Sequence, residues 1–171
     1  LGLDAYMPVP DENPLTPQKA ALGRKLFFDP LLSGDGSLSC STCHVPRLGF
    51  TDGKSLAVGI GGRKGKRRTP RLVNRGYGRS FFWDGRAATL EEQATGPVEN
   101  SIEMGHSMAA VVAQFSKIPE YEKRFQKVFG TGVTKEGFAK AVAAFERTVL
   151  SGDSPYDRFV KGDKSALSEA Q

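Results

Sequence analysis

Two cysteines and a histidine stand within five residues of this chain, in the order Cys40-Ser41-Thr42-Cys43-His44. At this spacing two thiols can add across the vinyl groups of one haem as thioethers, while the imidazole ligates the iron. The motif therefore predicts one covalently bound haem c. Cys40 and Cys43 would be the attachment sites and His44 the proximal iron ligand, all held by one short helical turn.

The same residues fit two other kinds of site less well. A closed structural zinc site needs four ligands, and the only other cysteine or histidine in the chain is His106. A thioredoxin-like dithiol is expected inside a βαβ pattern, which the sequence does not show. Haem c is therefore the preferred interpretation of the motif.

The composition suits one loop-rich domain wrapped around a large apolar cofactor. The 171 residues are 39% hydrophobic and include 20 glycines and 10 prolines. No apolar run reaches membrane-spanning length, so no membrane span is expected. The N-terminus lacks a signal-peptide pattern, and Leu1 is expected to be a mature N-terminus after cleavage. Because haem c is attached outside the cytoplasm, the expected compartment is the periplasm.

Helices dominate the predicted secondary structure, which gives an all-α, c-type cytochrome-like haem domain with long irregular loops over residues 1–171. The segment after Thr134 places Phe138, Val142, Phe145 and Val149 at steps of four, three and four, which predicts a buried helical stripe. Caps or N-terminal prolines predict the other helix starts, at Thr16-Pro17, Thr89, Ser107 and Pro119.

Residues 46–84 show no sustained period and are predicted to form one long functional loop organised by a ligand. Much of the net charge of +5 comes from this loop, through residues 63–68 and then Arg71, Arg75 and Arg79. Such a cluster can bind haem propionates or an acidic protein, or can simply be a solvated loop. No nucleic-acid motif accompanies it, so nucleic acid is not an expected partner.

Several separated motifs run from about residue 15 onward, at residues 22–29, 32–39, 82–87, 92–94, 96–97, 103–104, 144–148 and 151–152. Together with the haem motif they resemble the N-terminal, peroxidatic half of the bacterial di-haem cytochrome c peroxidase and MauG family. The resemblance implies an oxidoreductase that reduces hydrogen peroxide through a high-valent iron intermediate. It also implies that the electrons come from a second haem or a small redox protein.

The resemblance further assigns residues to the iron face opposite His44. Glu103 matches the family's distal acid and base, Gln93 its pocket amide and Pro97 its wall. Trp83 matches the tryptophan between the two haems. Heterolytic cleavage of the peroxide O–O bond requires a proton to leave the inner oxygen and reach the outer one, and a carboxylate near both can move it. Without the match, Glu103 would be interpreted as a surface carboxylate and Trp83 as a core aromatic.

Three departures from the family pattern alter these expectations. In the family a second haem domain follows at about residue 171, so the second haem is expected on a longer chain or elsewhere. The glycine-rich loop at residues 58–62 lacks the histidine that many members place there, so the iron is expected to be open. His106 is then the only spare imidazole. Arg68 precedes Thr69-Pro70 where the family has a calcium-binding asparagine, which makes calcium doubtful.

A single-haem electron carrier is the competing class of function. Met104 lies 60 residues beyond His44, a spacing that suits an axial methionine, and Met108 is close by. Against this, the family keeps a methionine after its distal glutamate without using it as a ligand. MauG-like oxidation of a protein substrate is a further alternative, and the sequence leaves open whether two copies form a homodimer.

Overall fold

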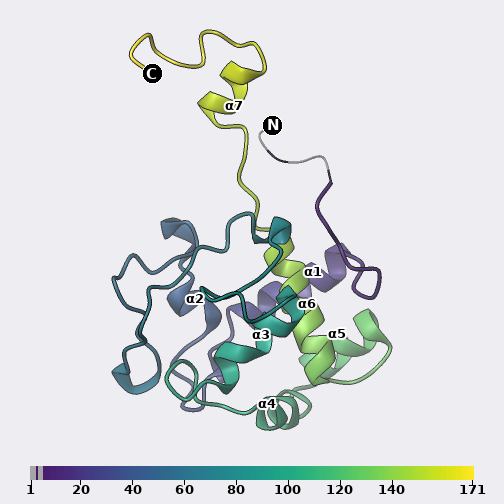
Figure 1. Ribbon diagram of the computed structural model, residues 1–171. Coiled ribbons are helices and arrows are strands. Elements are labelled where there is room, and N and C mark those ends of the chain that lie inside the picture. Colours follow the sequence, from purple (N-terminus) through teal and green to yellow (C-terminus); the bar gives the residue numbers. More distant parts are fainter. Residues whose placement is uncertain (1–2, 4–5) are drawn as a thin grey trace.

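The computed structural model describes residue 3 and residues 6–171, and this part of the chain is helical (Figure 1). Its α-helices are α1 (Pro17–Phe27), α2 (Cys40–Cys43), α3 (Leu90–Glu99), α4 (Met108–Phe115), α5 (Pro119–Phe129), α6 (Lys135–Arg147) and α7 (Pro155–Val160). Over the same residues, β pairing is limited to isolated bridges, such as that between Phe81 and Ala87. The predicted all-α class is confirmed. None of the helices described has the length and apolar character needed to cross a bilayer.

The core forms where α6 packs between α1 and α3. Phe138, Val142 and Phe145 of α6 are all buried, as their helical spacing predicts, and Val149 is buried just beyond the end of the helix. Gly23 lets α1 approach closely, because a Cβ at this position would overlap the backbone carbonyl of Ala141. The predicted stripe is therefore the centre of the domain.

The helix starts follow the predicted caps. The hydroxyls of Thr16, Thr89, Ser107 and Thr134 each accept a bond from a backbone N–H three residues later, and prolines open α1 and α5. At α3 a capping box between Thr89 and Glu92 is only half formed. Glu92 accepts from the backbone N–H of Ala88 at 2.8 Å instead of from that of the cap residue. Helix α7 had no counterpart in the prediction.

A buried ion pair fixes α3 against α6. Arg147 donates to both carboxylate oxygens of Glu91, at 2.6 and 3.1 Å, and Asn13 also donates to Glu91. Burial opposes the ionisation of Glu91, yet the bonds from Arg147 and Asn13 hold its pKa below the ordinary value. The pair therefore sets the position of the helix that carries Gln93 and Pro97.

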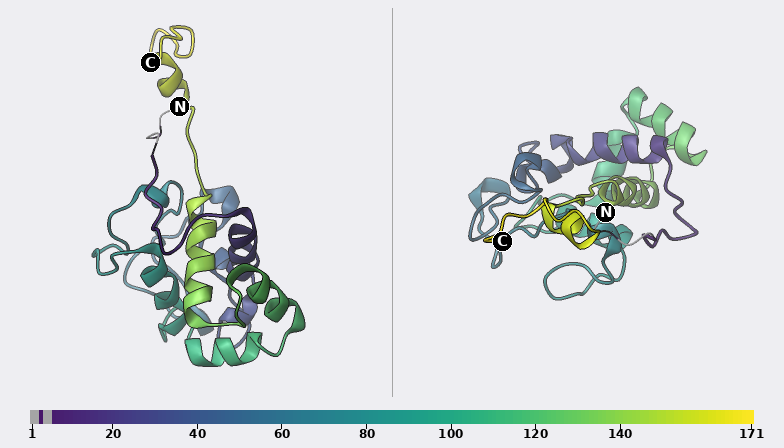
Figure 2. Two further views of the ribbon diagram at one scale, coloured as in Figure 1. Left: turned by 90° about the vertical axis from the view of Figure 1, so that its right-hand side faces the viewer. Right: turned by 90° about the horizontal axis from the view of Figure 1, so that it is seen from above.

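The segment between α2 and α3 is irregular, as predicted, and contains only short 3₁₀ turns at Pro46–Leu48, Ile60–Gly62 and Arg75–Tyr77. Its basic residues Arg63, Lys64, Arg67, Arg68 and Arg71 are exposed. At the other end of the chain, α7 and the residues after it stand away from the helical body (Figure 2). Tyr156 and Val160 of α7 are exposed there.

Candidate haem site

The sequence Cys40–Cys43 forms the single helical turn α2. The backbone N–H of Ser39 donates to Oγ1 of Thr42 at 3.0 Å, and the N–H of His44 donates to the carbonyl of Cys40 at 2.9 Å. Both thiols are free and half-buried. The turn therefore presents two thiols and one imidazole from adjacent positions, the arrangement that attachment of one haem requires.

The orientation of His44 is set by a tight return of the chain. Val45 pairs with Thr51, and Gly49 and Phe50 both adopt positive φ, which brings the Phe50 carbonyl back to the ring. Nδ1 of His44 lies 3.0 Å from this carbonyl oxygen and donates to it. Burial lowers the pKa of His44 and favours the neutral ring. Nε2 is consequently the unprotonated nitrogen, the state that a metal ligand needs.

The surroundings of both cysteines disfavour the thiolate form. Burial raises the pKa of Cys40 to about 12, and burial followed by the charge of Asp52 raises the pKa of Cys43. A redox-active dithiol depends on thiolates, which electropositive surroundings favour. The raised pKa values of both thiols therefore argue against a redox-active dithiol.

Glu103 lies in a turn that is held from several sides. Its N–H donates to the carbonyl of Asn100, and Nδ2 of Asn100 donates to its Oε1 at 2.7 Å. The carbonyl of Glu103 accepts from the N–H of Ile60 at 2.7 Å, and the N–H of Met104 donates to the carbonyl of Pro97 at 3.2 Å. The backbone around Glu103 is therefore fixed by both the glycine-rich loop and α3.

The glycine-rich loop also connects Glu103 to the α2 turn. The Cys43 thiol donates to the carbonyl of Val58 at 3.8 Å, two residues before the Ile60 contact with Glu103. Gly59 between them has no room for a Cβ, which would meet the backbone of Glu103. The charge of Glu103 also contributes to the raised pKa of Cys43. Glu103 thus lies near the predicted site of attachment.

Burial raises the pKa of Glu103, while the bond from Asn100 and the charge of Arg86 act in the opposite direction. Gln93 and Pro97 are half-buried and lie four residues apart on α3, on the same face of the helix. Pro97 is tied to the Glu103 turn through Met104. Gln93 has no hydrogen bond to Glu103 in the described structure.

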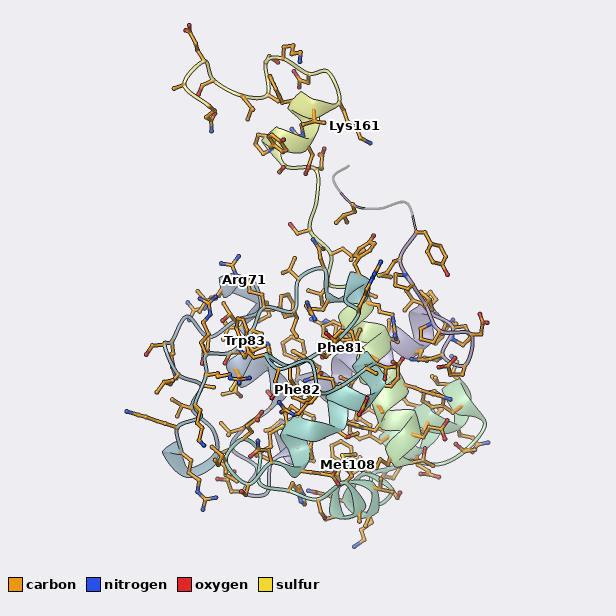
Figure 3. The ribbon with its side chains drawn as sticks, in the orientation of Figure 1. Arg71, Phe81, Phe82, Trp83, Met108 and Lys161 are labelled. Atoms are coloured by element: carbon orange, nitrogen blue, oxygen red, sulfur yellow. The ribbon has the colours of Figure 1, made fainter. Side chains whose placement is uncertain are left out.

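Trp83 lies among the loops, as Figure 3 shows. It is 51% exposed, and its Nε1 donates to the carbonyl of Arg68 at 2.8 Å. The guanidinium of Arg68 lies 5.5 Å from the indole centroid. Trp83 is therefore a surface aromatic in this domain and not a core residue.

Two residues of the motif at 82–87 lie beside α3 although sequence reasoning gave them no role. Phe82 has a φ of +64°, and its ring packs on Gly96, where a Cβ would lie 2.8 Å from Cζ. The guanidinium of Arg86 lies 3.5 Å from the centre of the same ring. Their position in the motif at residues 82–87 was the signal in the sequence that could have identified them. The contact between Phe50 and His44 had no signal in the sequence.

The other candidate iron ligands are Met104, Met108 and His106, and they pack or bond elsewhere in the domain. Met104 and Met108 are 5% and 1% exposed and pack in the main hydrophobic core. His106 is half-buried, and its backbone N–H donates to the carbonyl of Val98 at 2.9 Å. Core packing therefore accounts for both methionines.

Two free thiols and an imidazole with a free Nε2 on one turn fit haem c. The model of the di-haem cytochrome c peroxidase family matches residues 17–165. The chain is 47% identical over 163 residues to the methylamine utilization protein MauG of Methylorubrum extorquens, which covers 94% of this chain and 46% of that protein. It is 40% identical over 169 residues to the cytochrome c peroxidase Ccp of Escherichia coli, covering 98% and 36%.

Among solved structures, a MauG-like protein associated with microbial copper homeostasis has a TM-score of 0.88 and 37% identity, covering 98% of this chain and 51% of its own. The chain thus spans about half, or less, of the length of the relatives it matches. These matches extend over nearly all of the described domain. The chain belongs to the di-haem cytochrome c peroxidase family.

Proposed function

We propose that Cys40, Cys43 and His44 would hold one haem c in this domain, and that the domain reduces hydrogen peroxide with the help of Glu103. The observation that carries the proposal is the position of Glu103. Glu103 is half-buried, and it is held close to the α2 turn by Asn100 and the glycine-rich loop. Burying an acid without a cationic bonding partner costs free energy, and such groups cluster at functional sites.

Each side chain around the proposed peroxide site has a separate role. Asn100 donates to Oε1 of Glu103, which leaves Oε2 to take a proton from the inner oxygen of peroxide and deliver it to the outer one. Gln93 offers an amide that can orient the peroxide, and Pro97 adds a wall without an N–H group. When bound, haem c supplies the iron that binds peroxide and the path for the electrons that reduce it.

The electron source and the compartment are part of the same proposal. We infer that the domain is the N-terminal half of a two-haem protein, with a second haem domain or a small redox protein as donor. The length of the relatives supports this inference. The periplasm is the proposed location because haem c is attached outside the cytoplasm. We further propose that two copies can form a homodimer, which sedimentation analysis would test.

Oxidation of a protein partner is the second candidate function. Its support is the exposed indole of Trp83, which offers an aromatic ring at the surface, together with the 47% identity to MauG. We expect Trp83→Phe to keep the fast reaction with peroxide but to lose oxidation of the partner. An electron carrier is less well supported, because Met104 and Met108 are packed in the core.

The decisive test compares Glu103→Gln with Glu99→Gln, both in the haem-loaded protein. Glutamine keeps the shape of Glu103 and an oxygen for Asn100 but cannot shuttle a proton, so the peroxide rate should fall about 10²- to 10⁴-fold. Glu99 is an exposed carboxylate at the end of α3, paired with Lys135 at 3.0 Å, and its variant should react like the wild type. Rapid mixing with peroxide measures both. An unchanged rate in Glu103→Gln would remove this residue from the mechanism.

A further inference from the structure

We propose that Arg86 is a positioning residue of the peroxide site, because its guanidinium holds the Phe82 ring against the turn of α3 to which the Glu103 segment is hydrogen-bonded. This inference rests on the proposed function and adds a residue to it. Arg86 lies in the loop before α3, outside the haem motif and outside the set of residues matched to the distal pocket.

Four groups form a continuous stack at this place. The Phe82 ring packs on Gly96 of α3, which has no side chain to displace it. The tip of the ring, Cζ, meets Gly96, and the guanidinium of Arg86 lies over the ring, 3.5 Å from its centre. Nη1 of Arg86 donates to both oxygens of Asp84, at 2.8 and 3.0 Å. A planar guanidinium that is fixed by a carboxylate can clamp an aromatic ring in a way that a flexible ammonium cannot.

The loop that carries the stack is anchored but strained. Phe81 and Ala87 exchange backbone hydrogen bonds at 2.9 and 3.4 Å, and both side chains are buried. Between them Phe82 adopts a φ of +64°, which is unfavourable for a bulky residue. Such a conformation persists only where the surroundings enforce it, and strained residues cluster at functional sites. The clamp on the ring supplies that enforcement.

The Phe82 ring contacts α3 at the helical turn that is hydrogen-bonded to the Glu103 segment. Gly96 lies next to Pro97, whose carbonyl accepts from Met104, and three residues after Gln93. Figure 3 shows Phe82 beside this helix, whereas Trp83 lies further out. Displacing the Phe82 ring would therefore disturb the helical turn on which Pro97 and the Glu103 segment depend.

The charge of Arg86 acts on Glu103 as well. Burial raises the pKa of Glu103, and the positive charge of Arg86 opposes this effect, so it favours the carboxylate that can accept a proton from peroxide. Other ionisable groups face the Glu103 turn from the elements packed around it. They are Cys43 of α2, Asp35 before α2, Arg63 directly after the glycine-rich loop, which donates to the Ser101 carbonyl, and His106, three residues after Glu103.

The Arg86 side chain is 54% exposed, so water screens its charge. We therefore expect its removal to change a rate or an affinity by about two- to fivefold. This is smaller than the loss expected for Glu103→Gln, as befits a residue that acts through Phe82 and Glu103.

The test uses Arg86→Met and Arg86→Lys in the haem-loaded protein, with Arg158→Gln as matched control. Arg158 is also half-exposed and also pairs with an aspartate, Asp153, but it lies on α7. The pH dependence of the peroxide rate and the fluoride affinity of the ferric protein are measured for each. Arg86→Met should move the acid limb of the rate profile to higher pH and weaken fluoride binding about two- to fivefold. Arg86→Lys, which keeps the charge, should leave the acid limb in place.

Equal profiles and equal fluoride affinities for Arg86→Met and Arg158→Gln would overturn the inference. If Arg86→Met does not retain haem, Arg86→Gln replaces it in the same comparison, with the same two outcomes. If even the wild type fails to react with peroxide, the proposed function fails. The fluoride titration then still decides whether Arg86 places its charge at this site.

Discussion

Replacing Glu146 by glutamine removes the titration of a carboxyl that is buried in α6. Glu146 is 4% exposed, and its Oε2 has no hydrogen-bond partner within the described structure. Burial raises the pKa of Glu146 from the ordinary 4.5 to about 8, against the opposing charge of Arg147. The charge of Glu91 adds to the increase, and that of Arg75 opposes it. The folded protein therefore keeps this proton at neutral pH, whereas the unfolded chain releases it.

The size of the effect follows from the difference between the two pKa values. Between pH 4.5 and pH 8 the folded protein holds one proton more than the unfolded chain, so its free energy of unfolding falls as the pH rises. Each pH unit costs about 1.4 kcal/mol, which gives about 4 to 5 kcal/mol over the whole interval. The stabilising contribution is complete below pH 4.5 and is lost as the pH rises through 8. Glutamine has no proton to lose, so Glu146→Gln lacks this slope.

Denaturant unfolding of the haem-loaded protein, followed by circular dichroism across this pH interval, measures the slope. Glu146→Gln should become progressively more stable than the wild type as the pH rises. The matched control is Glu136→Gln on the same helix. Glu136 is 75% exposed and pairs with Lys140, so its variant should keep the slope of the wild type. Parallel stability curves for the wild type and Glu146→Gln would refute the reasoning, because they would mean that Glu146 is ionised in the fold.

Three further predictions concern the cofactor and the core. Cys40→Ala or Cys43→Ala should weaken or abolish covalent retention of haem and reduce the helix content, as mass spectrometry and circular dichroism would show; a double variant that folds fully without haem contradicts this. Arg147→Met should cost about 3 to 5 kcal/mol in the free energy of unfolding, because it leaves the mostly buried Glu91 carboxylate without its cationic partner, and adding Glu91→Gln should recover part of the loss. The ferric iron should be five-coordinate or hold only water, which electron paramagnetic resonance of the oxidised protein would show. A low-spin bis-histidine signal that disappears in His106→Ala would instead mean that the site is closed at rest.

Local features of the domain could be predicted from the sequence. The haem motif can be recognised because its three residues act within one helical turn. Thr16, Ser107 and Thr134 predict helix starts because a capping side chain accepts a bond from an N–H only three residues away. The buried stripe of α6 follows from helical periodicity alone. The position of Glu103 as a candidate came from the family resemblance and not from any local rule.

Contacts between distant segments were decided by the tertiary structure. The ion pair of Glu91 with Arg147 joins residues 56 positions apart, and nothing in the sequence identifies one residue as the partner of the other. The contact of the Phe50 carbonyl with His44 depends on two consecutive residues at positive φ, of which only Gly49 favours that conformation. The sequence could not indicate either contact.

The clamp of Arg86 on Phe82 shows the same division most clearly. The motif that contains both residues was visible in the sequence, but its use depends on the missing side chain of Gly96 and on a strained φ at Phe82. Capping and periodicity arise within a turn of the chain, so sequence alone determines them. Burial, strain and the charge around Glu103 depend on which surfaces meet when the loops close, and only the folded structure determines that.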